Sequence, residues 1–147
     1  MTPYHYTESG LDNVYLYNIP IVKDAGGEEV VYIPKINMLH KTIAQGIINK
    51  KGLLTGKEIK FLRKEIGYMQ SQFSELLGKE AQACGRWERG EHPIDKTIDT
   101  LIRMIISKEL ELHLDYSVIP SLNTLSAAND NINIDGTDNN YALMDVA

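Results

Sequence analysis

The first fifty residues carry two short alternating stretches followed by a longer helical one. Apolar side chains alternate with tyrosines over 14–19, a period of two that predicts a strand. A glycine-rich turn at 24–27 follows, and the apolar run over 29–33 predicts a returning strand. Apolar residues then recur at every third or fourth position over 36–49, which predicts a helix. A hairpin and one helix within 1–53 are marginal alone, so we expect this element to pack on something else or to dimerise.

From residue 54 the apolar positions follow a helical period. Thr55 and Glu58 have the spacing of a capping box, in which each side chain bonds the other residue's backbone N–H, and they predict a helix start. The apolar positions of four predicted helices are Ile59, Leu62 and Ile66, then Phe73, Leu76 and Leu77, then Cys84 and Trp87, then Ile98, Leu101, Ile102 and Ile105. The expected fold class is mostly α with a small N-terminal β element (α+β), with a compact helical unit over 54–110.

The net charge of −5 is distributed unevenly. Five lysines cancel five acids over 1–53, and ten basic residues against nine acids leave +1 over 54–109. The rest of the chain holds six acids and no lysine or arginine. The negative net charge of the whole chain therefore says little about what residues 54–109 bind. We expect residues 111–147 to form an acidic, flexible tail with a short helix around 118–125.

Composition excludes several classes of protein. A hydrophobic fraction of 43% can bury a core, and no apolar run approaches the ~18 residues of a membrane span. The single cysteine, Cys84, excludes an internal disulfide framework. With no basic-then-apolar leader at the N-terminus, we expect a cytoplasmic protein without membrane partners.

The stretch 67–90 carries the strongest functional signal. On a helix predicted over 80–89, Cys84 and Trp87 share one face, which Ala81 extends, while polar side chains occupy the opposite face. Glutamine can pair with adenine and arginine with guanine in the major groove, and a residue at a helix start can reach a phosphate. The predicted DNA-contacting residues are Gln70, Ala81, Gln82, Ala83, Arg86 and Arg89. Two alternatives stay open: Arg86 pairs with Glu88 or a neighbour on a solvated surface, or Gln82 is an ordinary exposed residue.

Five positions of this stretch match a known pattern at fixed offsets without a gap: Gln70, Gly78, Trp87, Glu88 and Gly90. The stretch thereby resembles the Xre/Cro helix-turn-helix family, in which Trp-Glu-x-Gly closes the recognition helix. The resemblance implies a bundle of four to five helices and a homodimer that reads a palindromic operator in double-stranded DNA. Met69 and Glu80 depart from it, since serine caps are usual there, and so does Gly85 within the recognition helix.

The chain also resembles antitoxin-like regulators related to the MqsA family, in the segments 4–14, 39–40 and 54–63. This resemblance covers about residues 4–107 and places Gln82 and Arg86 where that family has its DNA-reading Asn and Arg. It implies the antitoxin of a type II toxin–antitoxin operon, which represses its own promoter and binds a toxin. MqsA builds a zinc site from two CxxC pairs; this chain has one cysteine, so we expect no metal and no cofactor.

No other chemistry emerges from the sequence, and we expect no enzyme. The four histidines are far apart, and a Cys84–His pair would need a thiolate inside the expected core. The segment beginning at Asn131 lacks a calcium loop's closing glutamate, because Ala142 holds that position. Alternatives to an antitoxin are a stand-alone repressor of a phage or mobile element, and a protein-binding module with a vestigial helix-turn-helix.

Two further expectations concern contacts. The dimer interface is expected from the hairpin 14–33 with the helix 36–49, or alternatively from the fourth helix through Ile102 and Ile105. The favoured interpretation of the tail is a solubilising spacer without a partner. The hypothesis set against it is that the apolar residues of the tail bind a toxin while its acids speed the encounter; these residues are Leu143, Met144 and Val146, with Asp130, Asp135, Asp138 and Asp145. A repellent of DNA phosphate is a further alternative.

Overall fold

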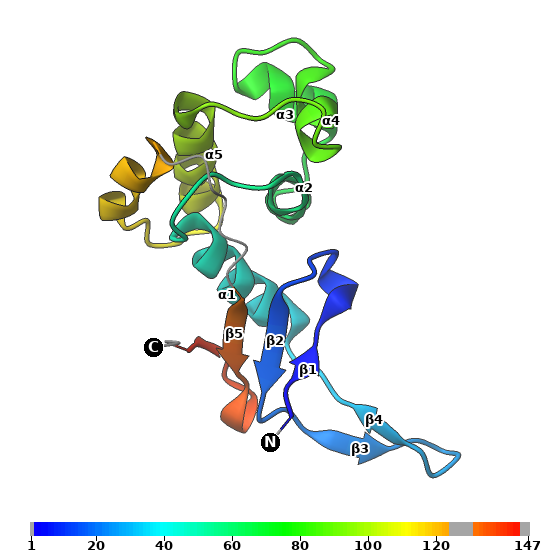
Figure 1. The fold of residues 1–147 in the computed structure, drawn as a ribbon. Coiled ribbons are helices and arrows are strands. Elements are labelled where there is room, and N and C mark those ends of the chain that lie inside the picture. The colour runs from blue at the N-terminus through cyan, green and yellow to red at the C-terminus, as the bar shows by residue number, and fades with distance from the viewer. Residues whose placement is uncertain (1, 124–130, 145–147) are drawn as a thin grey trace. The chain divides into compact units, whose positions relative to one another are not determined.

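The structure is a computed structural model that describes residues 2–123 and 131–144 (Figure 1). The chain divides into two compact units, which we call the N-terminal unit (1–43 with 130–147) and the helical unit (44–129). The chain is therefore mixed α and β, as expected, but the predicted boundaries at 53 and 110 are not those of the compact units. The first helix begins in one unit and ends in the other, and the chain's last segment returns to the first unit.

A four-stranded sheet forms the centre of the N-terminal unit. In spatial order its strands are β1 (Tyr4–His5), β2 (Val14–Tyr17), β5 (Ile132–Asp135) and β6 (Ala142–Leu143). β1 and β2 are antiparallel, β2 and β5 parallel, and β5 and β6 antiparallel. Val14 and Leu16 are buried while Tyr15 and Tyr17 are half-buried, which is the alternation that the sequence predicts. Two short 3₁₀ turns, Thr7–Ser9 and Thr137–Asn139, also belong to this unit.

The prediction of a flexible tail over 111–147 is wrong for residues 131–144. β5 lies inside the sheet between β2 and β6, and Ile134 is completely buried. Asp135, taken as an acid for a partner, accepts a hydrogen bond from Asn18 Nδ2 at 2.8 Å. Leu143 and Met144 are partly exposed, whereas Asp130, Asp145 and Val146 lie outside the described residues.

The start of the predicted tail is also ordered, within the helical unit. Gln45 exchanges two hydrogen bonds with the backbone of His113, at 2.6 and 3.0 Å. Asn49 donates to the same carbonyl and accepts from the N–H of Asp115. The two side-chain amides thus replace the bonds that a neighbouring strand would make. The helix expected around 118–125 is a 3₁₀ helix, η2 (Tyr116–Asn123).

The predicted hairpin exists with a different first strand. β3 (Ile21–Lys23) pairs antiparallel with β4 (Glu29–Val31) around the predicted turn, as a separate two-stranded sheet. The strand expected over 14–19 ends at Tyr17, because Asn18 adopts a left-handed backbone with φ of 59°. Residues 21–30 are all exposed, so the described residues bury neither face of this hairpin.

Five α-helices form in the described residues, in the order that the sequence predicts. They are α1 (Ile36–Ile48), α2 (Gly56–Glu65), α3 (Gln70–Leu76), α4 (Ala83–Glu88) and α5 (Lys96–Glu109). The capping box at α2 is confirmed: Thr55 Oγ1 accepts from the Glu58 N–H, and Glu58 Oε1 accepts from the Thr55 N–H. Asp95 caps α5 in the same way, through the Ile98 N–H at 2.8 Å.

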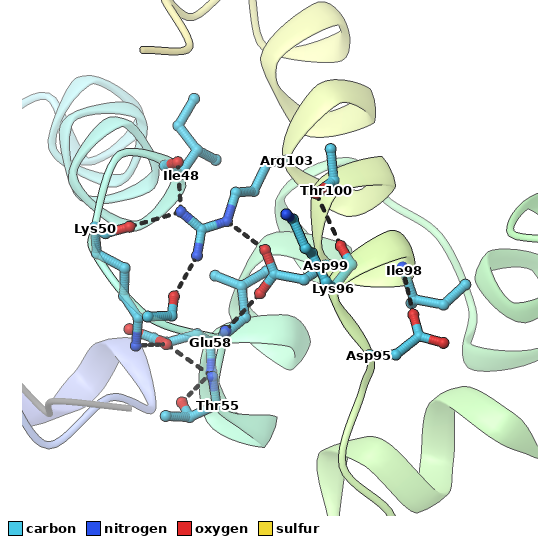
Figure 2. Close-up of polar contacts among 12 residues, drawn as sticks. Ile48, Lys50, Thr55, Glu58, Asp95, Lys96, Ile98, Asp99, Thr100 and Arg103 are labelled. Carbon is cyan, nitrogen blue, oxygen red and sulfur yellow. Dashed lines mark hydrogen bonds and ion pairs between the residues drawn. The ribbon is translucent and has the colours of Figure 1, made fainter. Parts of the chain in front are cut away.

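A completely buried ion pair connects α5 to the segment between α1 and α2. Arg103 Nε donates to Asp99 Oδ1 at 2.6 Å, and neither side chain has any exposed surface. Figure 2 shows the guanidinium donating also to the backbone carbonyls of Ile48 and Lys50. It donates to the carbonyl of Gly52 as well, at 2.6 Å. The other oxygen of Asp99 accepts from the Leu54 N–H at 2.7 Å.

Each charge of this pair is compensated by its partner and by further hydrogen bonds: Arg103 makes four among the described residues and Asp99 accepts two. Buried arginine and aspartate are costly unless paired and bonded, and here both conditions hold. Burial raises the pKa of the Asp99 carboxyl, and the positive charge of Arg103 opposes that rise. Beside the pair, Lys50 Nζ lies 2.7 Å from Glu58 Oε1, which also takes part in the capping box (Figure 2). The turn after α1 is therefore held by polar contacts.

The first testable prediction concerns this pair. Asp99→Ala should lower the free energy of unfolding by about 3–5 kcal/mol, because it leaves the buried guanidinium of Arg103 without its counter-charge. Glu109→Ala, on the exposed end of the same helix, should stay within about 0.5 kcal/mol of the parent. Urea unfolding followed by circular dichroism measures both.

A double variant sharpens the test. Replacing both charges with apolar residues is often neutral in proteins. Here the double variant Asp99→Leu with Arg103→Met should remain less stable than the parent. It leaves three backbone carbonyls and one N–H without their hydrogen-bond partners. A double variant as stable as the parent would contradict the structural role of the pair.

Candidate nucleic-acid interface

Two short helices, α3 and α4, occupy the stretch 67–90 in which the sequence predicts a helix-turn-helix, within the helical unit (Figure 1). The chain turns between them through residues 77–82, where Gly78 takes a left-handed φ of 73°. Ser74 connects the helices: its Oγ donates to the Gln70 carbonyl and accepts from the Cys84 N–H at 2.9 Å. Ser74 is completely buried, so this connection is shielded from water.

The helix that the sequence predicts over 80–89 is shorter in the structure. α4 spans six residues, Ala83–Glu88, instead of 80–89. Gln82 is its N-cap and Arg89 its C-cap, and residues 81–82 form a turn. Ala81 is consequently exposed and does not extend the buried stripe of Cys84 and Trp87, so that expectation is wrong.

Cys84 and Trp87 anchor α4 in the core, as predicted, with exposed fractions of 0% and 8%. Burial raises the pKa of the Cys84 thiol to about 12, and the neighbouring carboxylate of Glu88 adds to that rise. The thiol therefore stays protonated at neutral pH and donates from Sγ to Glu88 Oε2. This is a packing cysteine without nucleophilic character.

Glu88 accepts hydrogen bonds from α2, α3 and its own helix. Arg63 binds it bidentately, with Nε at 2.6 Å and Nη2 at 3.0 Å, and donates from Nη1 to the Tyr68 carbonyl. Gln70 Nε2 donates to Glu88 Oε1 at 3.0 Å. Burial raises the pKa of the Glu88 carboxyl, but the bonds from Arg63, Cys84 and Gln70 outweigh it, so the net shift is downward.

Gly85 faces the side chain of Gln70 across the two helices. A Cβ at this position would lie 3.2 Å from Gln70 Oε1 and 3.0 Å from Arg89 Nη1. The glycine that departs from the helix-turn-helix pattern therefore accommodates a close contact with α3. Gly56 does the same between α2 and α4, because its Cβ would come within 2.7 Å of the carbonyls of Trp87 and Glu88.

The predicted site residues line two neighbouring depressions of the helical unit. The first, of about 650 Å³, contains Gln70, Ala81, Gln82 and Arg89, together with Arg63, Met69, Ser71 and Gly85. The second, of about 310 Å³, contains Ala83 and Arg86, together with Lys79, Glu80, Trp87, His92, Pro93, Ile94, Asp95 and Ile98. Four of the six predicted residues thus come together, and the other two lie on the adjoining side of α4.

The two arginines among the predicted site residues are both ion-paired. Arg86 pairs with Glu80 at 3.0 Å, and Arg89 pairs with Glu91. The alternative in which Arg86 pairs with an acid is therefore realised in the structure, with Glu80 in place of Glu88. Gln82 is exposed and has no cap bond, so its amide is open to solvent.

Sequence reasoning missed Arg63, Met69 and Ser71, which line the first depression. One signal could have identified Arg63: it lies four residues after Ile59, on the apolar face of an amphipathic helix. A cation on such a face needs a partner, and the glutamate of the Trp-Glu-x-Gly ending supplies it. No comparable signal marks Met69 or Ser71.

The described residues show neither a metal-binding cluster nor a membrane-spanning helix. Among residues 2–123 and 131–144, no group of three or more His, Cys, Asp or Glu could hold a metal ion. None of the helices described here is long and apolar enough to cross a membrane. Comparison with known proteins finds no matching family model, no matching curated protein and no matching solved structure.

The second testable prediction concerns Glu88. Glu88→Gln should cost about 3 kcal/mol of unfolding free energy at neutral pH, because Arg63, only 9% exposed, loses its charged partner. Glu75→Gln removes the same charge at an exposed position of α3 and should cost little.

The lowered pKa of Glu88 determines how the stabilities of the parent and of Glu88→Gln should change with pH. A carboxyl whose pKa is depressed by folding stabilises the protein above its unfolded pKa, near 4.5, and loses that contribution as pH falls through the folded value. Stability should therefore fall less steeply below about pH 4.5 in Glu88→Gln than in the parent. Urea unfolding at a series of pH values measures the slopes; identical slopes would contradict the network.

Proposed function

We propose that the chain is a sequence-specific DNA-binding repressor that acts through the α3–α4 helix-turn-helix. The observation that carries the proposal is the exposed side of α4. A short helix, held by buried contacts to α2 and α3, presents a glutamine and two arginines next to the N-terminus of a second helix. Amide and guanidinium groups are the side chains that read adenine and guanine in the major groove.

The docking mode follows from this arrangement. α4 would enter the major groove, with Gln82 and Arg86 reaching base edges. Gln70, at the first turn of α3, would lie at the phosphate backbone, where N–H groups of a helix start also point. Its side-chain amide already bonds Glu88, so Gln70 would orient the two helices as well as meet the DNA.

The finer proposal is the antitoxin of a type II toxin–antitoxin operon that represses its own promoter. It acts as a cytoplasmic homodimer on a palindromic operator, and it carries out no catalysis. The exposed hairpin supports a protein contact in the N-terminal unit: Ile21 is 64% exposed, Val22 42% and Tyr32 51%. A second copy or a toxin would cover these side chains.

The third testable prediction addresses DNA binding. Arg86→Ala should weaken binding to the promoter by about 1–3 kcal/mol and relax base preference at one position in each half-site. Gln70→Ala should weaken binding to all sequences alike, since it removes a backbone contact. Fluorescence anisotropy with duplexes varied one base pair at a time measures both effects.

Lys108→Ala, at the exposed end of α5, is the control, and it should leave base preference unchanged. If Arg86→Ala and Gln70→Ala bind the promoter like the parent, α4 is not the docking helix. A protein that prefers no DNA sequence would instead support the protein-binding module.

A further inference from the structure

Both arginines of the proposed DNA surface are paired with carboxylates that flank α4. Arg86 Nη1 lies 3.0 Å from Glu80 Oε1, with side chains 37% and 68% exposed. Arg89 donates from Nε to Glu91, with side chains 60% and 51% exposed. One glutamate precedes the first residue of α4 and the other follows its last. The recognition helix therefore carries two positive charges that are both balanced by close negative ones.

Both carboxylates are exposed on the surface and do not take part in the packing of the helices. Glu80 does not cap α4, whose N-cap Gln82 makes no side-chain cap bond, and its carboxylate bonds Arg86 instead. Arg89 lowers the pKa of the Glu91 carboxyl, so Glu91 is ionised at neutral pH. Exposed pairs of this kind contribute little to stability, so each arginine can readily exchange its carboxylate for another partner.

A phosphate and a base edge are unequal replacements for such a carboxylate. At a phosphate the guanidinium exchanges one anion for another, while the released carboxylate stays close to the negative DNA backbone. At a guanine, O6 and N7 together accept two hydrogen bonds from one guanidinium. Loss of the carboxylate is therefore compensated when the arginine binds a guanine. It is unfavourable when the arginine binds a phosphate alone.

We propose that Glu80 and Glu91 are specificity residues of the α4 surface, where they neutralise Arg86 and Arg89 in the free protein and so suppress binding to DNA of unrelated sequence. The inference rests on the proposed function, because it concerns how the same surface discriminates between sequences. It requires no new ligand and no change of fold.

The experiment compares Glu80→Gln, Glu91→Gln and the parent on two duplexes. One duplex is enriched by the parent protein from a randomised pool, and the other has the same composition in scrambled order. Glutamine keeps the size and one acceptor oxygen while removing the charge. Glu109→Gln, at the exposed end of α5, is the matched control for the change of net charge.

Each variant should bind the scrambled duplex about fivefold more tightly near 0.15 M salt, because one more arginine is free to displace a counterion. The slope of log K against log salt should steepen by about 0.9 on that duplex. The enriched duplex should gain less, so the ratio of the two affinities falls, whereas Glu109→Gln changes neither quantity.

The outcomes separate this inference from the proposed function. If the parent prefers its enriched duplex but both variants keep the ratio of the Glu109→Gln control, the two glutamates are not specificity residues and the proposed function stands. If the parent enriches no sequence from the pool, the proposed function is wrong and the inference fails with it.

Discussion

The carboxylate of Glu88 fixes the position of α4 in the helical unit. A helix of six residues has too few internal hydrogen bonds to be stable alone, so α4 depends on tertiary contacts. Glu88 receives two bonds from Arg63 of α2 and one from Gln70 of α3, and Ser74 bonds the backbone at Cys84. These buried contacts fix which side of α4 faces solvent. The same carboxylate thereby links the stability of the helical unit to the geometry that the proposed function needs.

Polar anchors recur elsewhere in the helical unit. The Arg103–Asp99 pair satisfies the backbone between α1 and α2, and Gln45 with Asn49 satisfies the segment around His113. In each case a side chain takes bonds that secondary structure would otherwise make. Loops held in this way let short helices pack closely, and Gly56 and Gly85 remove the side chains that would separate them.

Local chemistry made the helices predictable from the sequence. The Thr55 capping box, the spacing of Cys84 and Trp87, and the turn at 24–27 act between near neighbours, and the structure has each of them. β5 could not be read in this way, because its Ile132 and Ile134 stand among Asn and Asp, and its partner β2 lies more than 110 residues earlier. The pairing of two parallel strands that are far apart in sequence depends on contacts that no local sequence pattern encodes.

The sequence pattern predicts the arrangement of the candidate residues only in part. It places the polar side chains of 80–89 on one face, whereas Arg86 lines a different depression from Gln82 and Arg89. The late start of α4, at Ala83, leaves Ala81 outside the buried stripe. The pairing of Arg86 with Glu80 depends on where the turn places a glutamate six residues earlier, which helical spacing does not describe. Because of this pairing, the positive charge of Arg86 is balanced by the negative charge of Glu80.

Methylation protection at guanine N7 tests the central claim most directly, because that atom lies in the major groove where α4 would read bases. With promoter DNA, the parent should protect guanines in two half-sites whose centres are about one helical turn apart, or a multiple of it. Arg86→Ala should lose protection of one guanine in each half-site and keep the remaining pattern. A parent that protects no guanine, or an Arg86→Ala variant with the parent's pattern, would contradict the account.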